Sequence, residues 1–156
     1  MQNTVAKEKN DAHDDLFIRT ERRLFSLPEL IQRIAFYEAD LRELQASDGT
    51  RGGERLRSVM RLIRPAARID QTEARNMQIK TLESDIAADR YEVRLLKRAL
   101  KCIREDPYYL TIEYKYFRHE PDEVVAEKLG CALTTVRRNR ANLVRRVSVV
   151  LYGVNG

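Results

Sequence analysis

The sequence predicts a nearly all-α protein, in which a helical hairpin or coiled coil precedes a carboxy-terminal helix-turn-helix. Three observations lead to this prediction. Apolar residues recur in steps of three and four along two long stretches, which is the period of a helix face. Six glycines and four prolines are few for 156 residues, as long uninterrupted helices require. No stretch of useful length alternates apolar and polar residues as a half-buried strand does.

The amino-terminal part is predicted to hold a tail and a first helix. Residues 1–15 are polar and lack apolar periodicity, so we expect a disordered tail there. Pro28 follows Ser26 and Leu27, which suits a helix that begins with proline in its first turn. The apolar stripe of this helix, which fades after Ala46, consists of Leu30, Ile34, Tyr37, Leu41 and Leu44.

A basic loop is predicted at 47–69. It begins with SDGTRGG, whose glycine, serine and aspartate residues are typical of loops. Between Arg51 and Arg68 it holds six arginines and one acid. Pro65 would break a helix in this region. Two interpretations stay open for the segment from Arg51 to Arg68, a second contact with DNA or a solvated tether.

A second long helix is predicted after this loop, with Asp70 or Thr72 as its cap. Asp89 occupies one position of its heptad stripe. So regular a stripe predicts burial against another helix, and two partners stay open: the 28–46 helix folded back antiparallel, or a second copy of the chain. The region 16–106 is therefore predicted to form a long-helix hairpin or an oligomerisation region. The apolar members of the stripe are Ile79, Leu82, Ile86, Val93, Leu96, Leu100 and Ile103.

Composition and motifs limit the classes of protein to which the chain can belong. Lys and Arg number 29 against 24 Asp and Glu, and the net charge of +5 is compatible with a nucleic-acid partner. We find no glycine-rich phosphate loop, no Ser/His/Asp arrangement and no cluster of metal ligands, so we expect neither an enzyme nor a cofactor. Cys102 and Cys131 are expected to be reduced, partly buried thiols. Without a signal peptide or an apolar span, we expect a cytoplasmic protein with no membrane contact.

The domain 107–156 carries the predicted function. Residues from Pro107 to about Phe117 are rich in tyrosine and are expected to form a helix in the core of this domain. Glu120 or Asp122 is expected to cap a short helix, with Pro121 near its first position, and Gly130 suits the left-handed residue that ends a helix. A turn of about three residues then leads to a longer helix, and two helices joined in this way form a helix-turn-helix. The expected core residues are Val125, Ala126, Leu129, Val136, Leu143 and Val147.

Charge indicates which helix meets nucleic acid. Between Leu133 and Leu151 the sequence has five arginines and no acid, whereas a solvated helix usually mixes charges of both signs. The early outward positions of a recognition helix face the bases, so Thr134, Arg137 and Arg138 are assigned to base reading. Because Ala132 stands where a capping Ser or Thr is common, Thr134 is expected to cap the helix. Contacts with phosphates are assigned to Thr135, Arg140, Arg145 and Arg146.

The region from Tyr108 to Gly153 resembles region four of bacterial sigma factors. Over roughly residues 20–153 the chain also resembles the phage late-gene regulators of the ArpU and RinA type. The resemblance implies an activator of phage or prophage late genes in a bacterial host, with host RNA polymerase as a further partner. The matching pieces are Leu27-Pro28, Asp70 to Ile103, Tyr109 to Phe117, Val125-Ala126, Gly130-Cys131, Thr134 to Arg140, and Leu151 to Gly153.

We therefore expect a sequence-specific transcriptional regulator that binds double-stranded DNA as a homodimer or higher homo-oligomer. One alternative is a phage small terminase subunit, which binds DNA for packaging and forms rings. Such subunits usually place the DNA-binding domain first, and the order here is reversed. Another alternative is a coiled-coil scaffold with an incidental basic helix. The operator, the target genes and the choice between activation and repression stay open.

Overall fold

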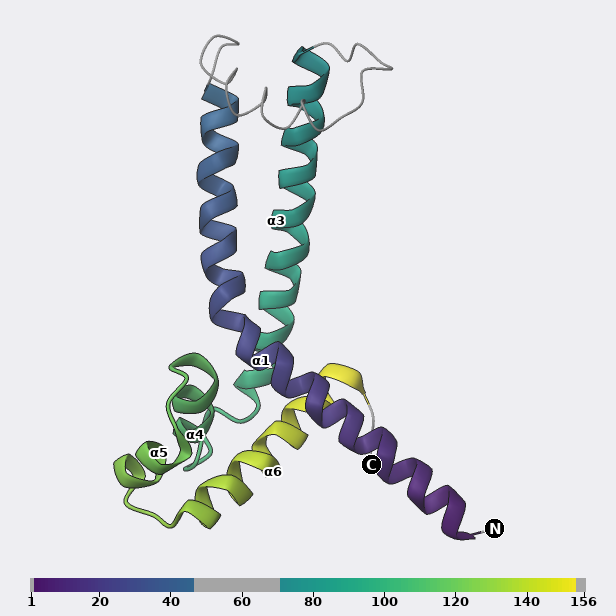
Figure 1. Cartoon of the computed structure of the whole chain (residues 1–156), viewed down its shortest axis with the longest axis vertical. Helices are drawn as coiled ribbons and strands as arrows, with labels where there is room; N and C mark the ends of the chain where they lie inside the picture. The colour runs from purple at the N-terminus through teal and green to yellow at the C-terminus, as the bar shows by residue number, and fades with distance from the viewer. Residues whose placement is uncertain (1, 47–70, 154–156) are drawn as a thin grey trace. The chain divides into compact units, whose positions relative to one another are not determined.

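The computed structural model describes residues 2–46 and 71–153, with side chains from Asp14 onward (Figure 1). Every element in these ranges is helical, which confirms the all-α prediction. The predicted basic loop at 47–69 and the candidate cap Asp70 lie outside the described residues. The elements are α1 (Gln2–Ala46), α3 (Gln71–Lys101), α4 (Leu110–Ile112), the π-helical η1 (Glu113–Phe117), α5 (Asp122–Leu129) and α6 (Leu133–Tyr152).

Helix α1 differs from the prediction at both of its expected boundaries. The prediction that a helix begins at Pro28 is wrong, because α1 continues through this residue. A proline inside a helix removes one backbone hydrogen bond, and burial of Leu24 and Leu27 in the preceding turn offsets that loss. The helix also begins at Gln2, where a disordered tail was predicted. That prediction rested on missing periodicity, and a helix can propagate from a formed turn without it.

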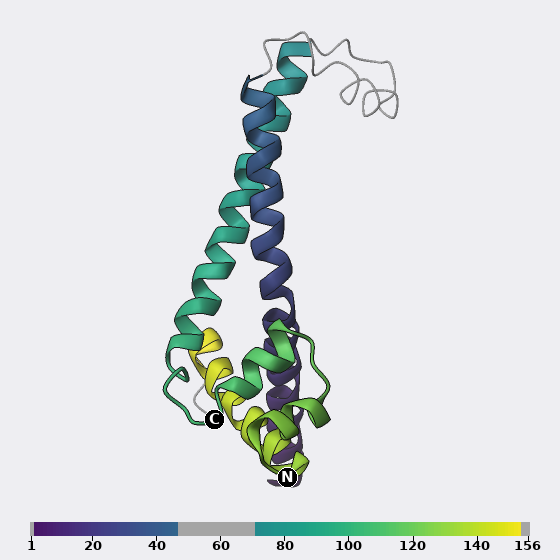
Figure 2. The same ribbon diagram turned by 90° about the vertical axis from the view of Figure 1, so that its left-hand side faces the viewer.

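The chain divides into two compact units, so the predicted region 16–106 is shared between them. We call Met1–Glu29 with Glu92–Gly156 the terminal unit, and Leu30–Tyr91 the middle unit. The described part of the middle unit pairs the second half of α1 with the first part of α3, side by side in two views (Figures 1 and 2).

Polar contacts show that these two helices of the middle unit run antiparallel. Arg33 near the start of the pair on α1 binds Asp89 through Nε and Nη2, at 2.7 and 2.6 Å. Further along α1, the carbonyl of Leu44 accepts a 2.6 Å hydrogen bond from Arg75, which lies earlier on α3. The Arg33 guanidinium also lowers the pKa of the buried Asp89 carboxyl below its ordinary value. This ion pair explains why an aspartate occupies one position of the apolar stripe.

The apolar stripe of the middle unit is only partly covered. Ile86 is buried, with 6% of its surface exposed, but its neighbour Leu82 is half-buried. Two helices alone form a thin layer that leaves one side of each apolar stripe open to water. The other half-buried members are Leu30, Ile34, Tyr37, Leu41, Leu44 and Ile79.

The terminal unit holds most of the buried core. On α3, Leu96 and Leu100 are buried as the heptad pattern predicts. On α1, Arg23 forms a paired ion contact with Glu92 at 2.6 and 2.9 Å. The other buried apolar residues of this unit are Leu24, Leu27, Val93, Ala99, Ile103, Ile112, Tyr116, Val125, Ala126, Val136, Leu143, Val144 and Val147.

The segment between α3 and α5 is less regular than predicted. The helix expected from Pro107 begins only at Leu110 and widens into a π-helical turn, in which the Arg118 N–H donates to the Glu113 carbonyl at 3.1 Å. Tyr116 is fully buried and donates a 2.6 Å hydrogen bond to Glu21. Burial, together with this carboxylate, raises the pKa of Tyr116 far above its ordinary value.

Two further predictions for this region need correction. Of the apolar and aromatic residues expected to form its core, Ile112 and Tyr116 are buried, whereas Leu110 is 42% exposed. Cys102 is exposed rather than partly buried, while Cys131 is half-buried as predicted, and both thiols are free. Cys102 lies in the turn that immediately follows the last residue of α3, where its neighbour Ile103 is the residue that is buried.

Candidate nucleic-acid interface

Helices α5 and α6 pack through a small apolar cluster. Val125 and Ala126 of α5 and Val136 of α6 are buried together, as the sequence predicts. The small side chain of Ala126 allows the two helices to approach closely. The half-buried residues packed around this cluster are Tyr114, Leu129, Cys131 and Leu133.

The turn between these helices depends on Gly130. Its backbone is left-handed, with φ 61° and ψ 34°, a conformation that L side chains rarely adopt. The Gly130 N–H donates to the carbonyl of Glu127, and the Cys131 N–H donates to that of Ala126, both at 3.1 Å. This pair of hydrogen bonds is the Schellman arrangement that closes the end of a helix. The turn therefore sets the point at which α6 begins.

Helix α6 begins without a side-chain cap. Ala132 holds the N-cap position with an extended backbone, and its side chain makes no capping hydrogen bond to the first turn. The prediction that Thr134 caps the helix is wrong, because a cap must lie outside the helix and Thr134 lies one residue inside it. The Thr134 side chain is exposed instead.

The start of α5 places a buried carboxylate among cations. Neither Glu120 nor Asp122 caps this helix as predicted, because Pro121 is the N-cap and Asp122 is the first residue inside α5. Asp122 is 8% exposed and accepts hydrogen bonds from Arg140 Nη1 at 2.6 Å and from Arg137 Nε at 3.0 Å. The Lys115 ammonium lies 3.2 Å from the same carboxylate. Hydrogen bonding from Arg140, and then from Arg137 and Lys115, outweighs burial and holds the pKa of Asp122 well below its ordinary value.

The two arginines bound to Asp122 differ in how much of their own side chains is exposed. The Arg140 side chain is 12% exposed and bonds the carboxylate through both terminal nitrogens, so its placement does not favour the predicted phosphate contact. The Arg137 side chain is 56% exposed and bonds Asp122 through Nε, with Nη2 at 3.8 Å from Glu123. Arg137 is thus fixed at its inner edge and accessible at its outer edge.

The arginines in the second half of α6 also have partners in the terminal unit. Arg146 donates to Asp106 at 2.8 Å and to the carbonyl of Cys102 at 3.1 Å. The Arg145 guanidinium lies 5.5 Å from the centre of the Phe17 ring on α1. Both side chains belong to exposed residues, so these contacts hold α6 in place without removing the two cations from the surface.

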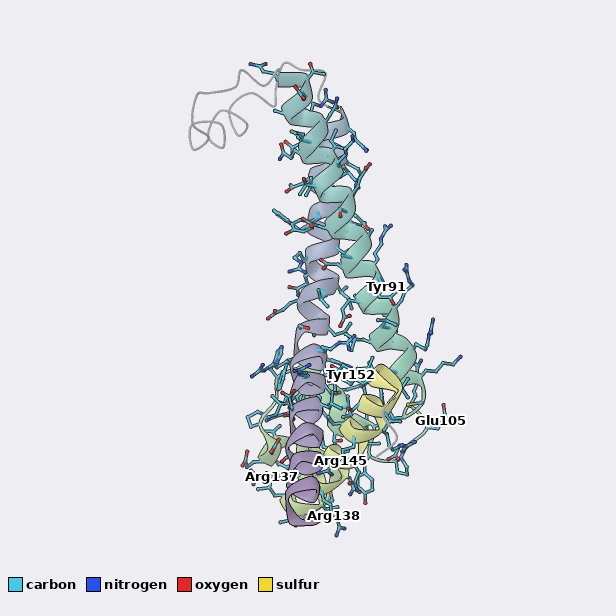
Figure 3. All side chains as sticks on the ribbon, turned by 90° about the vertical axis from the view of Figure 1, so that its right-hand side faces the viewer. Tyr91, Glu105, Arg137, Arg138, Arg145 and Tyr152 are labelled. Carbon is cyan, nitrogen blue, oxygen red and sulfur yellow. The ribbon has the colours of Figure 1, made fainter. Side chains whose placement is uncertain are left out.

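The predicted base-reading residues lie together. Thr134, Arg137 and Arg138 are exposed within the first two turns of α6, and Val136 between them is buried. Residues four apart on a helix are neighbours, so Thr134 and Arg138 lie side by side. Arg137 and Arg138 occupy the same end of the helix, away from Tyr152 (Figure 3). Within the described part of the chain, Arg138 has neither an ion pair nor a hydrogen bond.

The predicted phosphate contacts are more scattered. Thr135 is half-buried, and its carbonyl accepts a 2.9 Å hydrogen bond from Asn139. Arg140 is directed towards α5, and Arg146 towards the turn that follows α3. The structure thus groups the residues assigned to bases and separates those assigned to phosphates.

Comparison of the chain with protein-family models, curated proteins and solved structures finds no match. The resemblance to late-gene regulators therefore rests on the quoted residues alone. In the ranges 2–46 and 71–153, no helix is long and apolar enough to cross a membrane. The same ranges hold no group of three or more His, Cys, Asp or Glu residues that could bind a metal ion.

Proposed function

We propose that the chain is a sequence-specific DNA-binding transcriptional regulator, in which α5 and α6 form a helix-turn-helix and α6 is the recognition helix. The observation that carries the proposal is the exposed group of Thr134, Arg137 and Arg138 at the amino end of an acid-free helix. A recognition helix places these early residues against base edges in the major groove. Val136 faces the core, which fixes the rotation of the helix.

Arg138 is the strongest candidate for base reading. Its guanidinium has no competing partner among the described residues, so binding a guanine would break no internal ion pair. Arg137 can present its outer nitrogens while Asp122 holds Nε, and Thr134 adds a small hydroxyl beside them. Arg145 and Arg146 keep their assigned phosphate contacts in this proposal, whereas Arg140 acts through the Asp122 ion pair.

The resemblance supports a narrower proposal, an activator of phage or prophage late genes that works with host RNA polymerase. It rests on the tyrosine-rich segment before α5 and on the residues from Thr134 to Arg140. The experiment that tests the broader function is selection of duplexes from a random pool by the chain and by its Arg138→Ala variant. Enrichment of one motif, weakened by the substitution, is the expected result.

We also propose that the active form is a homodimer assembled through the middle unit. The support is the half-buried apolar stripe of this unit, together with exposed apolar side chains on both of its helices. Phe36 of α1 is 62% exposed and Met77 of α3 is 55% exposed. A second copy would cover such surfaces and complete a four-helix arrangement of the common kind.

A further inference from the structure

A second cationic surface of the terminal unit lies on α3 and the turn that follows it. Residues 94–104 contain five cations and no acid, and all five are exposed. Their spacing places the four that lie on α3 within one side of the helix, and Arg104 lies in the turn beyond it. The opposite side of the same stretch is formed by buried residues such as Leu96 and Leu100. We call this surface, which consists of Arg94, Lys97, Arg98, Lys101 and Arg104, the α3 basic face.

The α3 basic face places like charges next to each other. Lys97 and Lys101 are four residues apart, and Arg98 and Lys101 are three apart, so each pair is repulsive by a few tenths of a kcal/mol. None of these three cations has an ion pair or hydrogen bond within the described residues. The carboxy end of a helix favours cations, which accounts for Arg98 and Lys101 in the last turn. It does not account for Lys97, which lies before that turn.

Cations without partners are therefore concentrated on α3 rather than on α6. Arg137, Arg140 and Arg146 of α6 each bond a carboxylate of the terminal unit. On α3, long nitrogen-tipped side chains project away from the ribbon between the labelled Tyr91 and Glu105 (Figure 3). Exposed cations without internal partners, such as Lys97, Arg98 and Lys101, are the form in which proteins contact the phosphate backbone of nucleic acid.

The α3 basic face is attached directly to α6. Arg146 of α6 donates a 3.1 Å hydrogen bond to the carbonyl of Cys102, the residue after Lys101. Arg146 lies eight residues beyond Arg138 on α6, a rise of about 12 Å along the helix. The face is therefore held near the far half of α6, away from the residues assigned to bases.

From this placement we infer that the α3 basic face binds the phosphate backbone of duplex DNA, outside the base pairs that α6 contacts. The inference rests on the proposed function, because it assumes that α6 brings a duplex to the terminal unit. Lys97, Arg98 and Lys101 would supply contacts that do not depend on sequence. Base preference would come from α6 alone.

The test compares two double variants that remove the same charge. Lys97→Gln/Lys101→Gln alters the α3 basic face, and Arg22→Gln/Lys80→Gln removes two exposed cations that also lack ion pairs and hydrogen bonds, one on α1 and one earlier on α3. The probe is a mixed-sequence duplex of about 40 base pairs, and its affinity is measured by fluorescence anisotropy over a range of salt concentrations. Each lost phosphate contact lowers the slope of log affinity against log salt by about 0.9.

We expect the first double variant to lower this slope by about two and the affinity by about tenfold at low salt, with little change in the control. Its melting temperature should change little, because relief of the repulsive pair offsets the loss of Lys101 from the carboxy end of the helix. Equal slopes for the two double variants would overturn the inference, and the proposed function would still stand if Arg138→Ala weakened the motif selected from a random pool. An unmodified chain that does not bind the duplex would overturn both.

Discussion

Asp122 contributes both to the stability of the terminal unit and to the placement of Arg137 on the proposed recognition surface. One carboxylate, 8% exposed, receives Arg140, Arg137 and Lys115 from two other elements. Arg140 is nearly as buried as its partner, so the pair would be costly to break. The ion pairs also fix the inner edge of Arg137 through Nε, while its Nη2 lies 3.8 Å from the exposed Glu123 at the surface.

We predict that Asp122→Asn lowers the free energy of unfolding by about 3 kcal/mol, because it leaves the Arg140 guanidinium buried without an anion. Urea unfolding of the full chain measures this change. The control is Glu123→Gln, whose side chain is 68% exposed and lies 3.8 Å from Arg137, and it should cost less than about 0.5 kcal/mol. Equal losses in the two variants would show that Arg140 does not depend on Asp122.

The same substitution has a defined pH dependence. The pKa of Asp122 is lowered on folding, so its stabilisation is complete above the unfolded value of about 3.9 and is lost as pH falls towards the folded value. The difference in stability between the unmodified chain and Asp122→Asn should therefore shrink as the pH is lowered below about 4. A difference that stays constant down to about pH 2 would contradict the assignment.

The sequence could not reveal this site. The acid-free composition of α6 favours a nucleic-acid partner, yet Asp122 lies 15 and 18 residues before the arginines that it binds. Only the turn at Gly130 brings α5 and α6 into contact, and sequence spacing does not predict which charges then meet. Arg140 was therefore assigned to phosphates, although its side chain is directed inward.

At the scale of elements, the sequence predicted the features that depend on local chemistry. The left-handed Gly130, the buried cluster of Val125, Ala126 and Val136, and the burial of the heptad positions of α3 in the terminal unit follow from residue type and period. The continuation of α1 through Pro28 and the π-helical turn of η1 do not follow from residue type and period. Tertiary packing around Leu24 and Tyr116 decides them, and it overrides local preference.

The uncapped start of α6 predicts a substitution that stabilises the protein, in contrast to Asp122→Asn. Ala132→Ser places a hydroxyl where it can accept a hydrogen bond from the first turn, so it should raise the free energy of unfolding by about 1 kcal/mol. Ala141→Ser, inside the same helix, should give no gain, because serine is a weaker helix former than alanine. Thermal or urea unfolding compares the two variants. A stabilisation by both, or by neither, would mean that Ala132 is not the N-cap.

At the scale of the whole molecule, the half-buried stripe of the middle unit predicts self-association. We expect light scattering to give the mass of two chains, since a second copy can cover exposed apolar side chains such as Phe36 and Met77. A mass of one chain at micromolar concentration would contradict the proposed dimer. A ring of eight or more chains would instead favour the small terminase subunit.

Sequence reading by α6 is best tested by selecting preferred duplexes from a random pool with the full chain, Arg138→Ala and the control Arg22→Ala. Arg22 is also an exposed arginine without an ion pair or hydrogen bond in the described residues, but it lies on α1. We expect one enriched motif for the unmodified chain and the control. For Arg138→Ala we expect a flatter motif, with a loss of about 1–3 kcal/mol at one or two positions. An identical motif from all three proteins, or no enrichment by the unmodified chain, would contradict this expectation.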